Sequence, residues 1–320
     1  MMNILFISSC EIPDYQSNTI FHGLCRLPNM TVYTNADLWY MFEGNEPEQL
    51  LKSYGKGFSL YNRLDPCLKR VEESSVILKK IKEKFYTTII YGSILRCSLF
   101  LEDVLKVYAK NEIFFIEGED TDFSFYHSIY CINGIRSILY NLKNSFIVYK
   151  NYHKAKQLSK KGIYFKRELR ACDRKYFYPI SFAIPEENII RKIPEKTMEK
   201  AFIVPGDLRT YIYDNEEDYY KGYAISKYAV TTRKGGWDCL RHYEILANAC
   251  IPYFPDIEKC PHYTMCFFPK NIIKETNRLI EDNKLNSKLF EYYNNMLLEY
   301  TKKYLTTKSL AQYVLSFLPK

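Results

Sequence analysis

The sequence predicts an α/β fold with two Rossmann-like units, each built on a parallel sheet. Its 320 residues are enough for two domains of ordinary size, each with its own core. Hydrophobic residues make up 47% of the chain and charged residues 26%, which is typical of a globular protein. Short apolar runs alternate with helical stretches in both halves. Such alternation favours parallel strands joined by crossover helices.

The first half contains the strands of the larger expected sheet. β-Branched and aromatic runs such as Thr-Thr-Ile-Ile-Tyr and Ile-Phe-Phe-Ile predict buried strands. We expect strands at residues 3–8, 31–33, 87–91, 113–116 and 163–166, and helices at 19–27, from 94 to about 110, and at 134–161. Pro179 and the stretch Pro185-Glu186-Glu187 indicate a linker. The predicted boundary therefore separates an N-terminal unit, 1–184, from a C-terminal unit, 185–320.

The second half repeats the alternation of apolar runs and helices. We expect strands at residues 201–204, 228–231, 251–254 and 267–268, and helices within 239–249, 271–304 and 308–318. The helix within 239–249 follows the Gly235-Gly236 turn, whose backbone is permissive. Asp238 is expected to cap this helix, and Trp237 to pack against its first turn.

The helix within 239–249 has two distinct faces. A step of about 100° per residue places Leu240, Tyr243, Leu246, Ala247 and Cys250 on one apolar face. Arg241, Glu244 and Asn248 fall on an adjacent polar arc. A cation, a carboxylate and an amide beside the amides of a helix N-terminus suit a sugar linked to a phosphate. The alternative is that Arg241 and Glu244 form an ordinary solvated ion pair.

A resemblance to a known family adds to this interpretation. The pattern Arg-x-x-Glu-x-Leu-Ala-x-x-Cys-Ile-Pro, from Arg241 to Pro252, resembles the donor-binding helix of GT-B glycosyltransferases, particularly the exostosin-like branch. It departs from the broader family in having Asn248-Ala249 where a glycine is usual. The resemblance implies two domains that face a cleft, with the C-terminal helix, 308–318, crossing back to brace the first domain.

The resemblance also assigns roles to the donor-binding residues. It implies that Arg241 contacts the donor diphosphate and that Glu244 holds the nucleotide ribose. Arg233 and Lys234 would then offset the charge of the leaving group, together with the amides of Gly235, Gly236 and Trp237. We therefore expect transfer without a metal ion and without a cofactor, the nucleotide sugar being a substrate. The pair Lys166-Arg167 is interpreted as a surface pair.

The catalytic base is expected on the N-terminal unit. Asp14 lies in the loop after the first strand, His22 on the following helix, and Glu119 in the acidic run 117–122 after the strand 113–116. A base at the end of a parallel strand lies where α/β active sites usually form. The order of preference is Asp14, His22 and Glu119. The alternatives are a structural histidine and a solvated acidic loop.

Charge and cysteine usage limit the partners and the compartment. Residues 143–175 contain eleven Lys and Arg against two acidic residues, with Phe146 and Tyr149 among them. This stripe predicts either peripheral contact with an anionic membrane or a solvated face. A net charge of +8 without a recognisable nucleic-acid motif argues against nucleic acid as a partner. Ten cysteines without paired spacing favour a cytoplasmic protein.

These observations predict a glycosyltransferase. The donor is expected to be a nucleotide sugar, and the acceptor a hydroxyl of a glycan, a lipid-linked sugar or a protein. The alternative is a non-catalytic carbohydrate- or nucleotide-binding protein on the same scaffold. Such a protein would keep Arg241 and Glu244 but would show neither sugar transfer nor donor hydrolysis.

Overall fold

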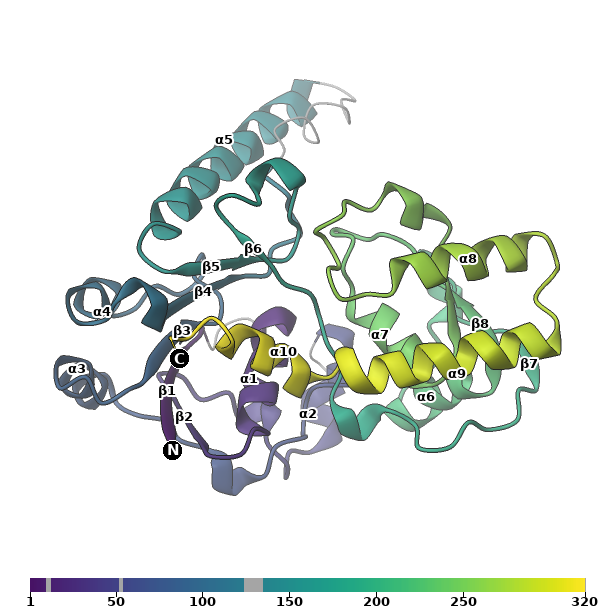
Figure 1. Cartoon of the computed structure of the whole chain (residues 1–320), viewed down its shortest axis with the longest axis horizontal. Coiled ribbons are helices and arrows are strands. Elements are labelled where there is room, and N and C mark those ends of the chain that lie inside the picture. The colour runs from purple at the N-terminus through teal and green to yellow at the C-terminus, as the bar shows by residue number, and fades with distance from the viewer. Residues whose placement is uncertain (10–12, 52–53, 124–134, 320) are drawn as a thin grey trace.

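Two separate parallel sheets form the framework of the molecule (Figure 1). The computed structural model describes residues 1–9, 13–51, 54–123 and 135–319. The first sheet has six strands and the second has three, and neighbouring strands in both run parallel. The predicted α/β class with parallel, Rossmann-like sheets is therefore confirmed.

The strands follow the expected order along the chain. Those of the first sheet are β1 (Met2–Ile7), β2 (Met30–Thr34), β3 (Thr88–Tyr91), β4 (Ile113–Glu117), β5 (Ile163–Lys166) and β6 (Tyr178–Pro179). They lie side by side in the order β2-β1-β3-β4-β5-β6. The second sheet contains β7 (Met198–Lys200), β8 (Ser226–Val230) and β9 (Ile251–Tyr253), in chain order. The predictions of β1 to β5, β8 and β9 are confirmed to within two residues.

Helices cover both sheets. They are α1 (Tyr15–Cys25), α2 (Pro47–Leu51), α3 (Ser74–Lys82), α4 (Leu101–Val107), α5 (Ile135–Leu158), α6 (Glu216–Ala224), α7 (Leu240–Ala247), α8 (Lys270–Glu281), α9 (Ser287–Tyr304) and α10 (Thr307–Leu315). Within the described ranges, none of them is both long enough and apolar enough to cross a membrane.

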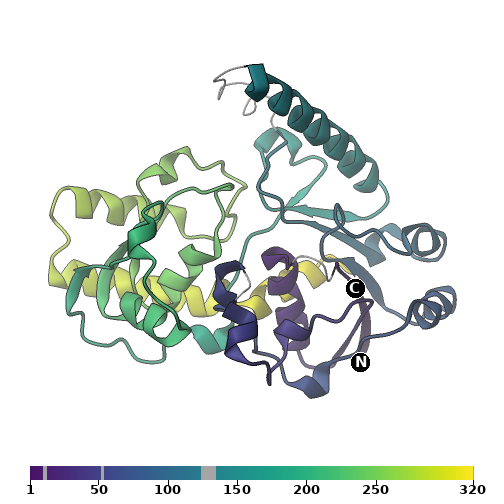
Figure 2. The same ribbon diagram turned by 180° about the vertical axis from the view of Figure 1, so that it is seen from behind.

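Alternating side chains of the first sheet build two cores. Ile4 and Phe6 of β1 pack in a cluster with α1 and α10, whereas Leu5 and Ile7 pack in a second cluster with α3, α4 and α5. Successive residues of a strand point to opposite faces, so this division follows from the strand geometry. The sheet is thus a central layer between two layers of helices, seen from both sides in Figures 1 and 2.

Three expected elements of the second half differ in the structure. Residues 201–204 are not a strand, because the Thr210 hydroxyl hydrogen-bonds with both the amide and the carbonyl of Val204 and closes a turn. Residues 267–268 form no strand either. The single helix expected over 271–304 is divided into α8 and α9. Asn283 adopts a left-handed backbone (φ 53°) between them, and the Asn286 side chain caps α9 through the amide of Leu289.

The last helix returns to the first sheet, as predicted. The amide of Thr307 donates to the carbonyl of Ile184 (2.9 Å), and the Tyr313 hydroxyl donates to the carbonyl of Pro179 in β6 (2.9 Å). On the other side α10 packs closely on α1, where a Cβ atom at Gly23 would collide with the Thr307 carbonyl. The absence of a side chain at Gly23 therefore allows the two helices to approach.

Candidate functional site

A cavity of about 830 Å³ opens where strands of both sheets reach their carboxyl ends. Its first wall follows strands of the six-stranded sheet and includes Asp14, Gln16 and Glu119. Its second wall follows strands of the three-stranded sheet and includes Arg241 and Glu244. Ligands of parallel α/β folds bind at the carboxyl ends of the strands, so this is the expected place for a site.

Arg241 places a largely buried guanidinium group in the wall of the cavity. Its residue is 9% exposed, and its Nε and Nη1 atoms have no hydrogen-bond partner among the described residues. The guanidinium lies 5.1 Å from the centre of the Tyr211 ring, and the Lys234 ammonium lies 6.0 Å from the same ring. A buried donor without a partner costs about 1–3 kcal/mol. An anion in the cavity would remove this cost, because guanidinium binds phosphate and carboxylate oxygens well.

Glu244 lies one turn further along α7 and has other partners. Its carboxylate accepts hydrogen bonds from the hydroxyls of Ser59 and Tyr219. Burial raises the pKa of Glu244, and these two hydrogen bonds oppose that effect. Arg241 and Glu244 are both buried, so the alternative of an ordinary solvated ion pair is wrong. Asn248, on the same predicted arc, donates to the carbonyl of Glu244 and has a structural role.

A segment of the first half, residues 54–63, lies against the second wall. Lys56 donates to the carbonyl of Tyr213 (2.6 Å), and the amide of Ser59 donates to Glu216 (2.8 Å). The Arg63 guanidinium pairs with the other oxygen of Glu216. This segment therefore supplies the hydroxyl that holds Glu244. Sequence reasoning missed it, because the contacts join residues more than 150 positions apart.

The glycine turn before α7 lines the cavity and packs closely against two carboxylates, those of Asp120 and Glu168. A Cβ atom at Gly236 would lie 2.5 Å from a Glu168 carboxylate oxygen, so the turn approaches that group closely. The same oxygen accepts a hydrogen bond from the amide of Asp238 (3.0 Å). Helix α7 begins only at Leu240. The expected contribution of the Trp237 amide to a phosphate site is wrong, because Glu168 accepts a hydrogen bond from it as well as from the Asp238 amide. The contribution of the Gly235 and Gly236 amides stays a prediction.

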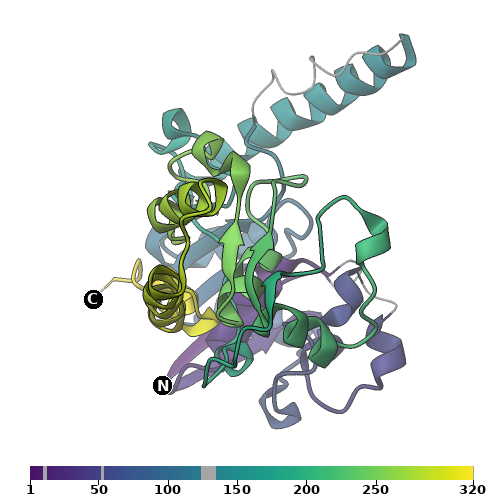
Figure 3. The same cartoon turned by 90° about the vertical axis from the view of Figure 1, so that its right-hand side faces the viewer.

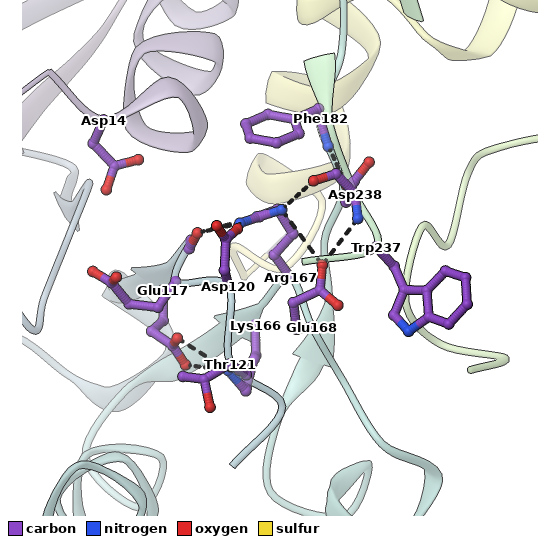
Figure 4. Close-up of polar contacts among 12 residues, drawn as sticks. Asp14, Glu117, Asp120, Thr121, Lys166, Arg167, Glu168, Phe182, Trp237 and Asp238 are labelled. Atoms are coloured by element: carbon purple, nitrogen blue, oxygen red, sulfur yellow. Dashed lines mark hydrogen bonds and ion pairs between the residues drawn. The ribbon is translucent and has the colours of Figure 1, made fainter. Parts of the chain in front are cut away.

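The predicted donor-binding residues divide into two groups. Lys234, Gly235 and Gly236 line the cavity together with Arg241 and Glu244. Trp237 does not: it packs 6.2 Å from the Phe254 ring, and the Arg233 guanidinium covers it at 5.2 Å. Figure 4 shows the indole pointing away from the acidic groups. The assignments of Arg233 and Trp237 to the donor are corrected, because their stacking holds both outside the cavity.

Asp238 was predicted to cap α7, and in the structure it does not. Cys239 takes the N-cap position of α7, and no side chain there bonds to the helix amides. The Asp238 carboxylate accepts instead from the amide of Phe182 (2.8 Å) and from the Tyr243 hydroxyl (2.9 Å). Burial raises the pKa of Asp238 to about 6, although Arg167 opposes this. Asp238 thus joins the turn before α7 to the segment that follows β6.

The three residues Lys166, Arg167 and Glu168 form a buried charge network (Figure 4). Lys166 contacts both oxygens of Glu117, at 3.0 and 2.8 Å, and both side chains are 1% exposed. Arg167 donates to the carbonyls of Gly118 (2.7 Å) and Asp238 (2.6 Å) and pairs with Asp120. The interpretation of Lys166-Arg167 as a surface pair is wrong, because both residues are buried at the end of β5, and Arg167 lines the cavity.

Of the three candidate bases, Asp14 has the most available oxygen. Asp14 caps α1, where its Oδ1 accepts from the amide of Ser17 (3.0 Å). Its Oδ2 has no hydrogen-bond partner in the described part of the chain and lies 3.6 Å from the Arg96 guanidinium. Glu119 lines the same wall, but Arg96 holds both of its oxygens, at 2.7 and 3.2 Å.

His22 is not a candidate base. It is fully buried, its Nδ1 lies 2.9 Å from the Thr307 hydroxyl, and its Nε2 lies 3.1 Å from Glu187. Helix α1 begins at Tyr15, four residues earlier than predicted, and α10 covers the face that carries His22. The assignment of His22 to the cavity is therefore corrected in favour of a structural role.

The His22–Glu187 pair predicts acid-sensitive stability. Burial alone would raise the pKa of Glu187, but the hydrogen bond and charge of His22, with Arg26, lower it from 4.5 to about 2. A carboxylate with a lowered pKa stabilises the fold above pH 4.5, and this contribution is lost as the pH falls toward 2. We expect Glu187→Gln to be less stable than wild type at pH 6, with the difference disappearing toward pH 2, in urea unfolding followed at several pH values.

The neighbouring residue provides a matched control for this pH dependence. Glu186 is 43% exposed in its side chain and pairs with Lys308 at the surface. Surface pairs contribute about 0–1 kcal/mol, so Glu186→Gln should follow the wild-type pH profile. Equal pH profiles for Glu187→Gln and wild type would show that the buried pair has no such effect.

Gln16 is a cavity residue that sequence reasoning did not select. Its side-chain amide donates to the carbonyl of Ser181 (3.2 Å), which fixes its orientation. Its Oε1 is buried and has no hydrogen-bond partner among the residues described. The only available signal was its position two residues after Asp14 in the loop–helix junction. The first wall thus presents Asp14 Oδ2 and Gln16 Oε1, two acceptor atoms that no donor of the described residues hydrogen-bonds.

The acidic run 117–122 is largely engaged with cations. Glu117 pairs with Lys166, Glu119 with Arg96, and Asp120 with Arg167. Within the described ranges, no group of three or more His, Cys, Asp or Glu side chains is placed to hold a metal ion. The expected independence from a metal ion stays a prediction.

No protein-family model matches the sequence. A search of curated proteins finds no significant match either. The function is therefore argued from the cavity and its side chains.

Proposed function

We propose that this chain is a glycosyltransferase that binds a nucleotide sugar in the cavity, with the diphosphate against Arg241 and Lys234. The observation that carries the proposal is the Arg241 guanidinium, which is buried and lines the cavity. Two of its nitrogens have no hydrogen-bond partner in the part of the chain that the structure describes. The exposed Lys234 ammonium, near the same Tyr211 ring, supplies a second positive charge. Two cations and an aromatic ring on one wall suit a diphosphate joined to a nucleoside.

The opposite wall supports a ligand that also carries hydroxyl groups. Asp14 Oδ2 and Gln16 Oε1 are buried acceptors that lack donors within the described ranges. A sugar hydroxyl donates one hydrogen bond and would satisfy either atom. A ligand that is anionic at one end and hydroxylated at the other therefore matches both walls. Nucleotide sugars and their hydroxyl acceptors together have this chemistry.

In the proposed reaction, each wall has its own role. The acceptor oxygen bonds to the anomeric carbon of the sugar, and the bond from that carbon to the phosphate oxygen breaks. Asp14 takes the proton of the acceptor hydroxyl at Oδ2, because this oxygen has no hydrogen-bond partner among the described residues whereas both oxygens of Glu119 are bonded to Arg96. Arg241 and Lys234 offset the charge of the departing diphosphate without a metal ion. This division follows the GT-B arrangement, with the acceptor on residues 1–184 and the donor on 185–320.

A thermal-shift screen with Arg241→Ala tests the proposal. We expect at least one of the UDP-, GDP-, CMP- and dTDP-sugars to raise the unfolding midpoint, because a ligand that binds only the folded state stabilises it. Arg241→Ala should weaken binding of that compound by about 10- to 100-fold, which corresponds to about 1.4–2.8 kcal/mol. The affinities are measured by calorimetric titration.

Arg209→Ala is the matched control. Arg209 precedes Tyr211 in the same segment, but its side chain is 89% exposed and pairs with Asp207. This variant should bind the donor as wild type does. Equal donor affinity for Arg241→Ala and wild type would contradict the site. A shift without sugar transfer or donor hydrolysis would assign the chain to the non-catalytic binding proteins.

A further inference from the structure

Helix α5 projects from the body of the molecule, with its N-terminal end pointing away from both sheets (Figures 1 and 3). Residues 135–161 contain no Asp or Glu. They contain seven basic residues, namely Arg136, Lys143, Lys150, Lys154, Lys156, Lys160 and Lys161. The positive charge of this helix is therefore not balanced by carboxylates of its own.

The described part of α5 has an inner and an outer face. Ala155 and Leu158 are buried at 0% and 5% exposure and join the core beneath the first sheet. With about 100° per residue, Phe146, Tyr149 and Lys150 fall within about 100° of arc on the side opposite Ala155. The outer face is thus both aromatic and basic, whereas the inner face is apolar.

Large apolar side chains are exposed on the projecting part of α5, two of them, Phe146 and Tyr149, on its outer face. Phe146 is 68% exposed, Tyr149 54% and Ile147 44%, within four consecutive residues. Single exposed apolar residues are common on soluble proteins, but a cluster on a projecting helix marks an interaction surface. Lys150 is exposed beside them, and Lys154 follows one turn later.

We propose that this outer face of α5 rests on an anionic lipid surface. Phe146 and Tyr149 would enter the boundary between headgroups and acyl chains, and Lys150 would contact lipid phosphates. The combination distinguishes a membrane from nucleic acid, because a nucleic acid offers its phosphates to lysine but no apolar layer to Phe146. The proposal does not depend on the function proposed for the cavity.

Binding to vesicles tests the proposal with a matched pair of double variants. The test variant is Phe146→Ser/Lys150→Glu, with the two positions four residues apart on α5. The control is Lys288→Glu/Tyr292→Ser on α9, where Lys288 is exposed and Tyr292 is 58% exposed, also four residues apart. Each pair replaces one Lys by Glu and so lowers the net charge from +8 to +6. A difference in vesicle binding between the two double variants therefore arises from where the substitutions lie and not from the total charge.

Sedimentation is measured with phosphatidylcholine vesicles and with vesicles in which about a third of the lipid is phosphatidylglycerol. We expect wild type to bind the anionic vesicles at least about tenfold more tightly than the neutral ones. The test variant should lose at least about tenfold in affinity for anionic vesicles, and the control less than about twofold. Thermal midpoints establish that both variants fold, and Tyr149→Ser alone serves as a milder second variant on the same face.

Three results would overturn the proposal. The first is wild-type protein that stays in solution with anionic vesicles. The second is an equal loss of binding in the test and control variants. The third is tighter binding to a single-stranded or duplex oligonucleotide than to vesicles, lost in the test variant, which would assign this face to nucleic acid.

Discussion

Replacing Asp14 by asparagine is expected to lower the turnover of sugar transfer by about 10²–10⁴-fold, with donor affinity largely kept. Asparagine cannot accept the proton of the acceptor hydroxyl. It keeps the fold, because its amide oxygen can still cap α1 through the Ser17 amide, which Asp14 binds at 3.0 Å. The cations proposed to hold the diphosphate lie on the other wall, so donor binding should change little. Turnover is measured at saturating donor, and donor affinity by titration.

Glu119→Gln is the matched control for the base. Glu119 lies on the same wall and loses a charge in the same way, but Arg96 already holds both of its carboxylate oxygens. Its loss of turnover should be much smaller than that of Asp14→Asn. The opposite order, with normal turnover in Asp14→Asn and a large loss in Glu119→Gln, would transfer the role of base to Glu119.

Replacing Lys166 by methionine should lower the free energy of unfolding by about 3–5 kcal/mol. The substitution keeps most of the side-chain volume but removes the charge that faces Glu117, and both groups are 1% exposed. Burial already raises the pKa of Glu117, and Lys166 is the main group that lowers it. Without that partner, the carboxylate either stays charged in an apolar environment or takes up a proton. Urea unfolding of the variant and of wild type measures the difference.

Two further variants separate the loss of this pair from other effects. Lys302→Met removes a lysine from an exposed pair with Glu299 and should cost no more than about 1 kcal/mol. In Glu117→Gln/Lys166→Met, no charge remains unpaired, so part of the lost stability should return. A Lys166→Met protein within about 1 kcal/mol of wild type would show that Glu117 finds another partner.

The strands and the principal cavity residues were predictable because the sequence patterns that indicate them lie within a few neighbouring residues. The run Ile-Tyr-Phe-Lys at 163–166 indicates a strand by its own β-branched and aromatic residues, and β5 has these bounds. Arg241 and Glu244 were selected because a helix brings residues three apart to one side, and both line the cavity. Asp14 was selected because it lies in the loop after the first strand, and it lines the cavity.

The residue roles that were predicted wrongly depend on contacts between segments that are distant in the sequence. Nothing near His22 shows that α10 will cover it, and the partner Thr307 is 285 positions away. The burial of Arg167 depends in the same way on the Asp238 carbonyl, 71 positions away. Ser59 reaches Glu244 from the first half of the chain, across 185 positions. Periodicity and spacing report which way a side chain points on its own element, but not which element will lie opposite.

The contact between α1 and α10 also determines the order in which the chain can complete its fold during synthesis. His22 and Thr307 are separated by 285 positions, which a ribosome adding about 5–20 residues per second covers in roughly 15–60 s. During that time the core cluster that contains Ile20 and Leu24 of α1 lacks the side chains of α10 that complete it, namely Leu310, Ala311 and Val314. A nascent chain therefore carries an exposed apolar surface long after its first sheet has been made. Whether the nascent chain aggregates therefore depends on how soon α10 is synthesised and packs on α1.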